Sequence, residues 1–368
     1  MKYRKSSMNS QMYYGDTKRP LLSFAIPTYN FGRFIAETIE SIVGGATVLK
    51  DDDYEIVVLD GGSTDDTPKV LAELSKKYRN IRYKINPSRG GIDRDLNEVA
   101  GTSNGTYIWL FSADDLLIHG WDRDIATLLI KSKDIYLIPA ELCDVSMKHL
   151  RNNPIFKTED SELIEFTFKG DTKSIDVYLE KANTLEALFS FMSAVIVRKD
   201  VWLRLKERPD YYGSCWAHCA RLLPLLFEDS SIVYANKFLI KKRGGNDSFM
   251  ENGFVSRIGI AINGWGSILF EYFDKQSHRA LLLQALRKDI PILLFAYAKI
   301  TAKDKQEVRR LDNMARELYW VWAAQWSTRM NYVFYLILPG ATKLNIILMP
   351  CLPSLIRMRH KIKALFVR

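Results

Sequence analysis

The stretch between residues 21 and 115 decides the fold, because it holds three apolar runs that each end in polar residues: LLSFAIPTYN (21–30), YEIVVLDGGSTDDTP (54–68) and TYIWLFSADD (106–115). A fourth run, NIRYKIN (80–86), has a similar strand-like composition. Helical patterns over 34–43, 66–78 and 93–100 separate these runs. Strands that alternate with helices at this spacing indicate βαβ units, and so predict an α/β fold with a mostly parallel sheet.

The polar residues that follow the strands form the candidate site. Ligands of parallel sheets bind at the carboxyl ends of the strands, so we expect Tyr29, Asp60, Asp114 and Asp115 to face one crevice. Adjacent carboxylates suit Mg²⁺ or Mn²⁺, which take one or two carboxylates and complete their shell with phosphate oxygens and water. Each motif alone also fits a turn or a helix cap, and only the combination favours a ligand site.

These motifs resemble those of glycosyltransferase family 2, which has the GT-A nucleotide-sugar-binding fold. The resemblance rests on FAIPTYN (24–30), VVLDGGSTDDT (57–67) and FSADD (111–115). It implies a Rossmann-like, mostly parallel sheet flanked by helices. It also implies a site in which the nucleoside is held by Pro27, Thr28, Tyr29 and Asp60.

The same resemblance assigns roles to the Asp-Asp pair and to a loop beside the donor. Asp115 is the expected direct ligand of the divalent cation, and Asp114 is expected nearer the ribose or sugar. The loop NPSRGGIDRD (86–95) matches the family's loop beside the donor. Arg94 in this loop is predicted to pair with a carboxylate or to reach the pyrophosphate, and a solvated surface arginine is the alternative. The sequence Asp-Gly-Gly at 60–62 departs from the commoner Asp-Asp-Gly, so a second carboxylate is absent there.

Three later segments are similar to the O-antigen abequosyltransferases and their relatives, which add a dideoxyhexose to a lipid-linked oligosaccharide. The segments are FSFMSAVIVRKDVW (189–202), YYGSCWAH (211–218) and KKRGGNDSF (241–249). In the last of them, Arg243 begins a glycine-bearing loop that is predicted to close over a diphosphate, to which Arg243 would donate charge-assisted hydrogen bonds. An ordinary turn is the alternative.

His218 is the candidate catalytic base. Many inverting relatives place a Glu-Asp pair at this position, and here a histidine, which can take a hydroxyl proton at neutral pH, stands in its place. A packed or capping histidine is the alternative. A zinc site with Cys215 and Cys219 lacks an evident fourth ligand, so a buried cysteine pair is preferred. The acidic pair at 228–229 is predicted to lie in a turn and ranks below His218 as the base.

Composition bounds the remaining possibilities. The chain has 368 residues, of which 47% are apolar and 26% charged, which excludes wholesale disorder. Four scattered cysteines and an N-terminus without an apolar h-region predict a reduced, cytosolic chain. We expect a flexible polar segment over 1–20, the catalytic α/β domain over 21–250 and a mainly helical region over 251–368.

The net charge of +9 is concentrated in the C-terminal tail. After Glu317 there is no acidic residue, and seven lysines and arginines follow. The tail over 328–368 has apolar runs that prolines interrupt, and none reaches the roughly 20 residues of a membrane-spanning helix. These features predict a segment that associates with an anionic membrane surface, not a nucleic-acid-binding domain. A C-terminal helix packed on the catalytic domain is the alternative.

Together these observations predict a metal-dependent glycosyltransferase that acts peripherally at the cytoplasmic face of the inner membrane. Its donor would be a nucleotide-diphosphate sugar, and its acceptor a hydroxyl of a lipid-linked (polyprenyl diphosphate) glycan in O-antigen-type synthesis. Two alternatives remain open, a sugar-phosphate nucleotidyltransferase and a non-catalytic, membrane-bound glycan-binding module on a GT-A scaffold. The first would favour a basic, glycine-rich loop near the N-terminus, which FAIPTYNFGRF (24–34) lacks.

Overall fold

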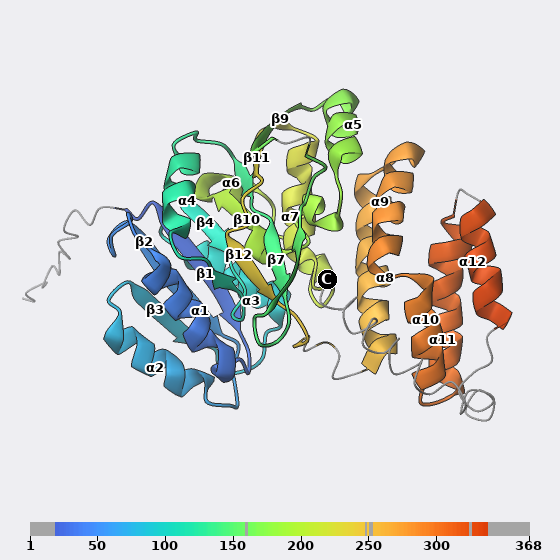
Figure 1. The fold of residues 1–368 in the computed structure, drawn as a ribbon, viewed down its shortest axis with the longest axis horizontal. Helices are drawn as coiled ribbons and strands as arrows, with labels where there is room; N and C mark the ends of the chain where they lie inside the picture. Colours follow the sequence, from blue (N-terminus) through green and yellow to red (C-terminus); the bar gives the residue numbers. More distant parts are fainter. Residues whose placement is uncertain (1–18, 159–160, 247–248, 250–252, 324–325, 338–368) are drawn as a thin grey trace, which may run out of the picture.

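The computed structural model describes residues 19–158, 161–246, 249, 253–323 and 326–337. Most of the predicted N-terminal segment, and residues 338–368 of the predicted membrane tail, lie outside this range. An α/β region comes first in the chain, and the helices α8–α12 lie beside it (Figure 1). β12 ends at Arg243 and α8 begins at Gly253.

The strands, in chain order, are β1 (Leu22–Thr28), β2 (Tyr54–Asp60), β3 (Ile81–Ile85), β4 (Tyr107–Leu110), β5 (Leu116–Leu117), β6 (Ile135–Leu137), β7 (Ala140–Cys143), β8 (His149–Asn153), β9 (Leu163–Lys169), β10 (Val195–Arg198), β11 (Asp229–Ala235) and β12 (Ile240–Arg243). The α-helices are α1 (Gly32–Gly45), α2 (Thr67–Lys77), α3 (Ile92–Thr102), α4 (Trp121–Leu129), α5 (Thr172–Lys181), α6 (Lys199–Arg204), α7 (Ala217–Leu222), α8 (Gly253–Tyr272), α9 (Gln276–Asp289), α10 (Ile292–Thr301), α11 (Lys305–Arg316) and α12 (Trp326–Ile337). Shorter helical turns are η1 (Leu185–Leu188), η2 (Met192–Ala194), η3 (Pro209–Tyr211), η4 (Leu223–Leu226) and η6 (Glu317–Val321).

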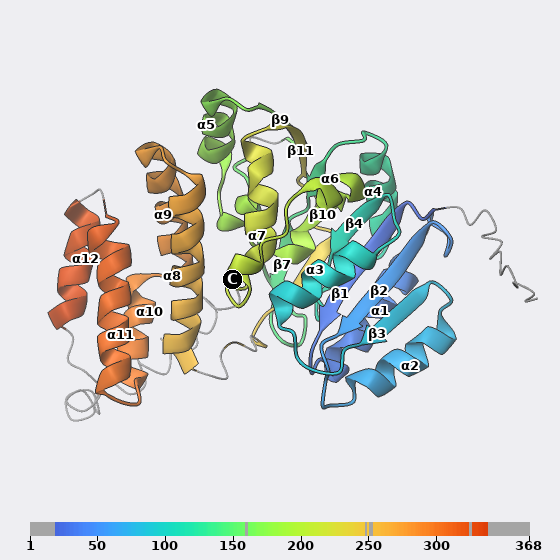
Figure 2. The same cartoon turned by 180° about the vertical axis from the view of Figure 1, so that it is seen from behind.

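The main sheet has eight strands in the order β3-β2-β1-β4-β10-β6-β11-β9. The first four are parallel to one another, β10 runs antiparallel between β4 and β6, and β9 is antiparallel at the edge. The helices α1 and α2 cover one face of the sheet, and α3 covers the other (Figures 1 and 2). The predicted α/β fold, with a mostly parallel sheet flanked by helices and a helical C-terminal region, is confirmed.

The strand order reverses between β1 and β4. From β1 the chain moves outward to β2 and β3, and it then returns across the sheet through α3 to β4 on the other side of β1. In open α/β sheets, the crevice for ligands lies outside the carboxyl ends of the strands at such a reversal. The topology therefore places the ends of β1 and β4 at the expected binding site.

An aromatic cluster anchors this part of the sheet. Both β1 and β2 are buried along their whole lengths, as strands covered on both faces should be. The Phe24 ring stacks on Trp109 with centroids 5.1 Å apart and meets Trp121 edge-on at 5.2 Å. Both indole N–H groups are satisfied, because Trp109 donates to the Ser193 carbonyl and Trp121 to the Ile42 carbonyl.

The later strands are divided between two sheets. The segment over 134–144 forms β6 in the main sheet and β7 in a second sheet, whose order is β5-β12-β7-β8. The segment over 231–244 forms β11 and β12, and these two strands also belong to different sheets. The strands β8 and β9 were not predicted, because β8 is polar and almost wholly exposed and β9 has only two buried side chains.

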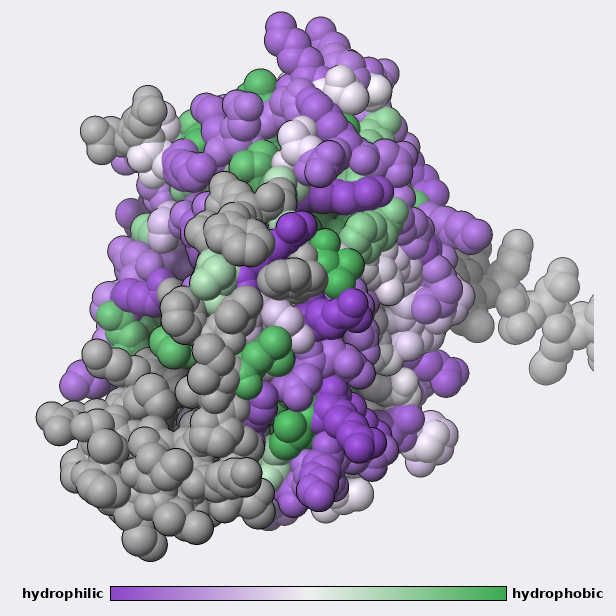
Figure 3. Space-filling view, turned by 90° about the vertical axis from the view of Figure 1, so that its right-hand side faces the viewer, coloured by the Kyte–Doolittle hydropathy of each residue, from purple (hydrophilic) through white to green (hydrophobic). Residues whose placement is uncertain are grey.

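The C-terminal helices pack on the α/β region through α8 and α9. A Cβ at Gly264 of α8 would lie 2.1 Å from a Trp216 ring carbon, so glycine permits this close approach. The face beside α12 is mostly hydrophilic over the described residues, with small separate hydrophobic patches (Figure 3). Within the described part of the chain, none of the helices has the length and apolar character needed to cross a membrane.

Candidate active site

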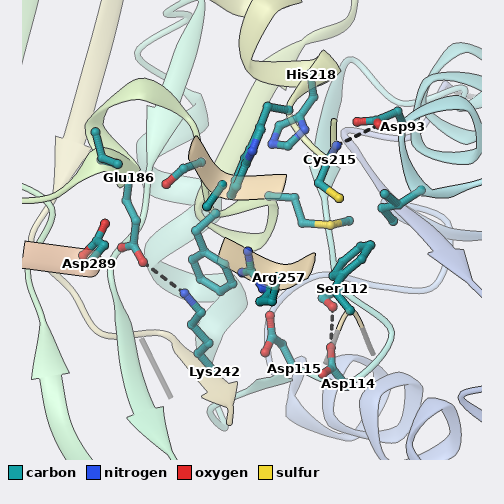
Figure 4. Close-up of a pocket in the computed structure, with 18 of the residues that line it drawn as sticks. Asp93, Ser112, Asp114, Asp115, Glu186, Cys215, His218, Lys242, Arg257 and Asp289 are labelled. Atoms are coloured by element: carbon teal, nitrogen blue, oxygen red, sulfur yellow. Dashed lines mark hydrogen bonds and ion pairs between the residues drawn. The ribbon is translucent and has the colours of Figure 1, made fainter. Parts of the chain in front are cut away.

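A cavity of about 670 Å³ opens at the carboxyl ends of β1 and β4 and extends to α8 and α9. It brings together residues from segments far apart in the sequence (Figure 4). Its lining includes all but one of the predicted site residues, namely Pro27, Thr28, Tyr29, Arg94, Asp114, Asp115, His218 and Arg243. Asp60 is the exception among the predicted residues.

The two aspartates after β4 are held by hydrogen bonds from three other segments. Asp115 accepts from the Ser193 hydroxyl at 2.6 Å and from the Arg243 backbone N–H at 3.0 Å. Asp114 accepts from the side chains of Ser112 and Asn246. Each carboxylate oxygen that accepts one hydrogen bond keeps a second lone pair. The two aspartates are therefore fixed in place, and their oxygens can still accept a further ligand.

The electrostatics of this pair fit a cation. Burial, and then the charge of Asp114, raises the pKa of Asp115 to about 7. Burial also raises the pKa of Asp114. No group of three or more His, Cys, Asp or Glu side chains is arranged as a metal site in the described part of the chain. The donor set matches Mg²⁺ or Mn²⁺, which need only one or two carboxylates when phosphate oxygens and water supply the rest.

Arg243 is directed toward the protein and supports the aspartates. Its Nε donates to the Asp114 carbonyl at 2.9 Å, and its Nη groups donate to the Val145 carbonyl at 2.7 Å and to Glu37 at 2.5 Å. The side chain is 3% exposed. Together with the bond from its backbone N–H to Asp115, these contacts make Arg243 a positioning residue for the pair. Its contact with a diphosphate stays a prediction.

The predicted nucleoside contacts Thr28 and Tyr29 lie at the carboxyl end of β1. The guanidinium of Arg89 lies 4.3 Å from the centroid of the Tyr29 ring. The Thr28 hydroxyl is buried without a hydrogen-bond partner among the described residues. Arg94 is exposed at the rim. The nucleoside-binding roles of Thr28 and Tyr29, and the contact of Arg94 with a carboxylate or the pyrophosphate, stay predictions.

Asp60 is the last residue of β2 and is not among the described residues that line the cavity. Its side chain is fully buried, and one oxygen accepts from the Ser63 N–H at 2.9 Å and from the Ser63 hydroxyl at 2.6 Å. The other oxygen has no partner among the described residues. A Cβ at Gly61 would lie 2.6 Å from an Asp95 carboxylate oxygen. Asp95 of α3 therefore occupies the space beside Asp60 that a side chain at position 61 would need.

Asp95 is expected to weaken the fold at neutral pH. Burial, and then the charge of Glu98, raises its pKa from 3.8 to about 6. The folded state then binds this proton more tightly than the unfolded state, so the free energy of unfolding falls as pH rises from about 4 to about 6. We predict that Asp95→Asn is more stable than the wild type at pH 7, by up to about 3 kcal/mol, and equally stable near pH 4. Urea unfolding at the two pH values measures this difference.

Glu98 provides the matched control. The hydrogen bond and the charge of Lys84 lower its pKa, so the ionised carboxylate stabilises the fold. Glu98→Gln loses the contact with Lys84 and relieves only part of the cost at Asp95, so it should gain less stability at pH 7 than Asp95→Asn does. If Asp95→Asn is less stable than the wild type at pH 7, the ionised Asp95 carboxylate does not destabilise the fold as proposed.

His218 lines the cavity at the start of α7. Its Nε2 lies 3.0 Å from the Phe189 carbonyl, which can only accept, so this nitrogen carries the proton and Nδ1 keeps the lone pair. Burial lowers the pKa of His218, so the ring is neutral at pH 7. Asp93 fixes the preceding loop by accepting the backbone N–H groups of Gly213, Cys215 and Ala217. The role of His218 as the catalytic base stays a prediction.

The other candidates of this region are placed elsewhere. Glu228 pairs with Arg204 on the exposed surface, and Asp229 is the first residue of β11 and not part of a turn. Cys219 is buried beside His218, and burial raises the pKa of its thiol well above the usual value. The described residues thus place neither the acidic pair nor a zinc cluster at the cavity.

Sequence reasoning gave no role in the site to the short segment 185–194, which forms one wall of the cavity. It contains η1 and η2, and it supplies the Phe189 carbonyl to His218 and the Ser193 hydroxyl to Asp115. Phe189 has a φ of 68°, which costs a bulky residue roughly 1–2 kcal/mol. The fold therefore holds this wall in a strained conformation beside both the aspartate pair and the candidate base.

Comparisons with known proteins agree with this geometry. Residues 23–181 match the family described as Glycosyl transferase family 2. The abequosyltransferase RfbV of Salmonella typhimurium is 28% identical over 302 residues, which are 81% of this chain and 89% of that protein. The GalNAc(5)-diNAcBac-PP-undecaprenol beta-1,3-glucosyltransferase of Campylobacter jejuni is 26% identical over 230 residues, which are 62% of this chain and 67% of that protein.

Solved structures share the fold. The S. aureus TarS 1-349 complex with UDP-GlcNAc superposes with a TM-score of 0.55 at 15% identity, and the match covers 81% of this chain and 80% of TarS 1-349. The mannosyltransferase PcManGT of Pyrobaculum calidifontis, in complex with GDP-Man and Mn²⁺, gives 0.50 at 14% identity over 87% of this chain and 86% of PcManGT. The fold is that of GT-A enzymes. The match over residues 23–181 gives the chain a glycosyltransferase family 2 domain, and together with the named relatives it supports a glycosyltransferase.

Proposed function

We propose that this glycosyltransferase moves a hexosyl or deoxyhexosyl group from a nucleoside diphosphate donor to a hydroxyl of a lipid-linked oligosaccharide, in the synthesis of an O-antigen-type surface polysaccharide. The observation that carries the proposal is the cavity itself. Its lining brings Thr28 and Tyr29 together with Asp114 and Asp115, and it extends to the C-terminal helices. The similarity to an abequosyltransferase along most of both chains supports the substrate class.

The transfer divides among the residues of the cavity. When bound, Mg²⁺ or Mn²⁺ neutralises the charge that develops on the leaving diphosphate. Asp115 and Asp114 would hold the cation, and Arg243 keeps Asp115 in place through its backbone N–H. The Nδ1 atom of His218 would take the proton of the acceptor hydroxyl as that oxygen attacks the sugar.

The family match favours this proposal over the two alternatives. A nucleotidyltransferase would need a basic glycine-rich loop after the first strand, whereas β1 is followed by Tyr29 and Asn30. A glycan-binding module without catalysis would not need two buried carboxylates of raised pKa in the cavity. Hydrolysis of a nucleotide sugar by the purified protein would exclude the second alternative directly.

A thermal-shift screen of nucleoside diphosphates with and without Mn²⁺ tests the donor class. A ligand that binds only the folded state raises the melting temperature by mass action. We expect one nucleoside diphosphate to raise the melting temperature, and Mn²⁺ to increase this shift. If no nucleoside diphosphate changes the melting temperature at millimolar concentration with Mn²⁺, the proposed donor class is wrong.

The acceptor and the location follow from the tail and from one relative. The Campylobacter relative is named for an undecaprenol-linked substrate, so we propose a polyprenyl diphosphate glycan at the cytoplasmic face of the inner membrane. The most exposed large apolar side chains of the C-terminal helical region are Leu293 at 55%, Val321 at 50% and Leu336 at 48%. They would lie at the membrane surface together with the basic tail.

We predict that removing residues 338–368 weakens binding to anionic liposomes at least tenfold. The segment contains six of the seven basic residues after Glu317, and each contributes about 1 kcal/mol near an anionic surface. The truncation keeps α12, which a hydrogen bond from Tyr335 to Asp312 ties to α11. Co-sedimentation measures binding, and raised salt should weaken it for the intact chain because salt screens surface charge.

A full-length variant separates charge from chain length. Changing Arg357, Arg359, Lys361 and Lys363 to glutamine keeps the apolar residues and should still lose most of the binding. If the truncated and intact chains bind equally well, the tail is not a membrane anchor.

A further inference from the structure

An ion pair in the cavity wall has no role in the transfer described above. The Nζ of Lys242 lies 3.2 Å from Oε1 of Glu186, and their side chains are 19% and 8% exposed. Both line the cavity, and Figure 4 shows Glu186 on the side opposite Asp93, with Lys242, Asp115 and Asp114 in the lower part of the view. The pair comes from two segments that are more than fifty residues apart, η1 and β12.

Glu186 has an unused acceptor. Its Oε2 is buried and has no hydrogen-bond partner among the described residues. Buried polar atoms are nearly always hydrogen-bonded, so an exception calls for an explanation such as a missing ligand. A carboxylate oxygen only accepts, and the missing partner must therefore be a donor such as a hydroxyl.

Lys242 and Phe191 complete a surface with the composition of a sugar site. The Lys242 ammonium lies 4.1 Å from the centroid of the Phe191 ring. Successive side chains of a strand point to opposite faces, which explains why Arg243 turns to Glu37 while Lys242 turns into the cavity. Ligand pockets typically combine aromatic surface with a few fixed polar groups.

The position of this surface relative to the chemistry is set by the segment 185–194. Glu186 and Phe191 lie in the same ten residues as the Phe189 carbonyl, which binds His218, and the Ser193 hydroxyl, which binds Asp115. A molecule held by Glu186 and Lys242 would therefore lie next to both the candidate base and the aspartate pair. The nucleoside end, with Thr28 and Tyr29, is on other elements, β1 and the residue that follows it.

We propose that Glu186, Phe191 and Lys242, here called the acceptor wall, bind the sugar that receives the transferred group. Glu186 Oε2 accepts a hydrogen bond from one hydroxyl of this sugar, Lys242 donates to a neighbouring oxygen, and Phe191 packs on its apolar face. The acceptor residue is then a neutral pyranose with two adjacent polar positions besides the reacting hydroxyl. This inference rests on the proposed function and specifies its acceptor.

The test measures binding of defined glycosides to the full chain, in the presence of the nucleoside diphosphate and Mn²⁺ that the thermal-shift screen selects. The probes are octyl glucoside, octyl galactoside and octyl mannoside, each with its monodeoxy analogues, and saturation-transfer NMR measures their affinity. We expect at least one glycoside to bind, and Glu186→Gln to weaken it about 10–100-fold, the size of one hydrogen bond to a charged group. One monodeoxy analogue should bind the wild type equally weakly, and Glu186→Gln should not weaken it further.

Matched variants keep the result interpretable. Lys242→Met alone would leave a buried unpaired carboxylate, so the double variant Glu186→Gln/Lys242→Met is used with it. Lys241→Met is the control, because its side chain is on the other face of β12 and does not line the cavity. Donor hydrolysis without acceptor should stay within about twofold of the wild type in Lys241→Met, and in Glu186→Gln it should fall much less than glycoside affinity does.

Three results would overturn the acceptor wall. The first is that the wild type binds none of the three glycosides. The second is that Glu186→Gln leaves glycoside affinity unchanged. The third is that donor hydrolysis falls as much as glycoside binding does, which would place the pair in the donor site. Failure of the proposed function is a different result, because then no nucleoside diphosphate would raise the melting temperature of the wild type.

Discussion

Replacing Asp115 with asparagine is expected to lower sugar transfer by a factor of about 10³ or more, while the folded chain stays at least as stable as the wild type. The loss of rate follows from the loss of the cation, whose charge stabilisation is worth several kcal/mol, and about 4 kcal/mol corresponds to 10³ in rate. Stability is kept because burial and Asp114 raise the pKa of Asp115 to about 7, so its ionised form is costly in the fold. The neutral amide also keeps an oxygen that can accept from Ser193 or from the Arg243 N–H.

Asp122 supplies the matched control, because the same substitution there should have the opposite effects. It is fully buried and accepts backbone N–H groups from Thr47, Val48 and Leu49, which lower its pKa although burial alone would raise it. Asp122→Asn should lower the melting temperature and leave transfer per folded molecule unchanged. Single-turnover rates and melting curves, with Mn²⁺ and with chelator, measure both variants. Near-normal turnover of Asp115→Asn in chelator would show that the assigned metal role is wrong.

The sequence was sufficient to predict the half of the site that depends on local patterns. The carboxyl ends of β1 and β4 were predicted together, because parallel strands end at one edge of a sheet and each strand is a continuous apolar run. Asp114, Asp115, Thr28 and Tyr29 consequently line one cavity. Asp60 was predicted from the same rule, but its orientation depends on Ser63, which binds its carboxylate and holds it behind the cavity.

The other half depends on contacts between segments far apart in the sequence, which no local pattern contains. Arg243 looks like a free loop arginine in the sequence, and only the fold shows Glu37, 206 positions away, accepting from it. Glu186 lies in a stretch with no periodic pattern, and its partner is 56 positions away on β12. Asp95 was noted as part of a helix start, but its position beside Asp60 follows from the packing of α3 against β1 and β2.

His218→Ala is expected to lower turnover by about 10²–10⁴-fold with donor affinity little changed, because a positioned base typically contributes that factor. The structure sharpens this prediction. The Phe189 carbonyl fixes the proton on Nε2, so the neutral ring presents Nδ1 as its only lone pair. A group that acts as a base must be unprotonated, and burial lowers the pKa of His218 below its ordinary value of 6.5.

The dependence of turnover on pH follows from the lowered pKa of His218. With Mn²⁺ at saturation, which keeps Asp115 ionised, turnover should decrease only below pH 6.5, where the ring becomes protonated, and His218→Ala should lose this acidic limb. His278 is the matched control, because it is also buried but its Nε2 pairs with Asp176 at 2.6 Å, and it does not line the cavity. His278→Ala should lower the melting temperature and keep both the turnover of the folded enzyme and its acidic limb.

His218→Asp should restore part of the lost turnover, because a carboxylate would again supply a base at this place with a shorter reach. A product of retained anomeric configuration would need no such base, since the leaving diphosphate can accept the proton. Retention, or an unchanged turnover in His218→Ala, would therefore leave His218 with only the structural role of holding the segment 185–194 against α7.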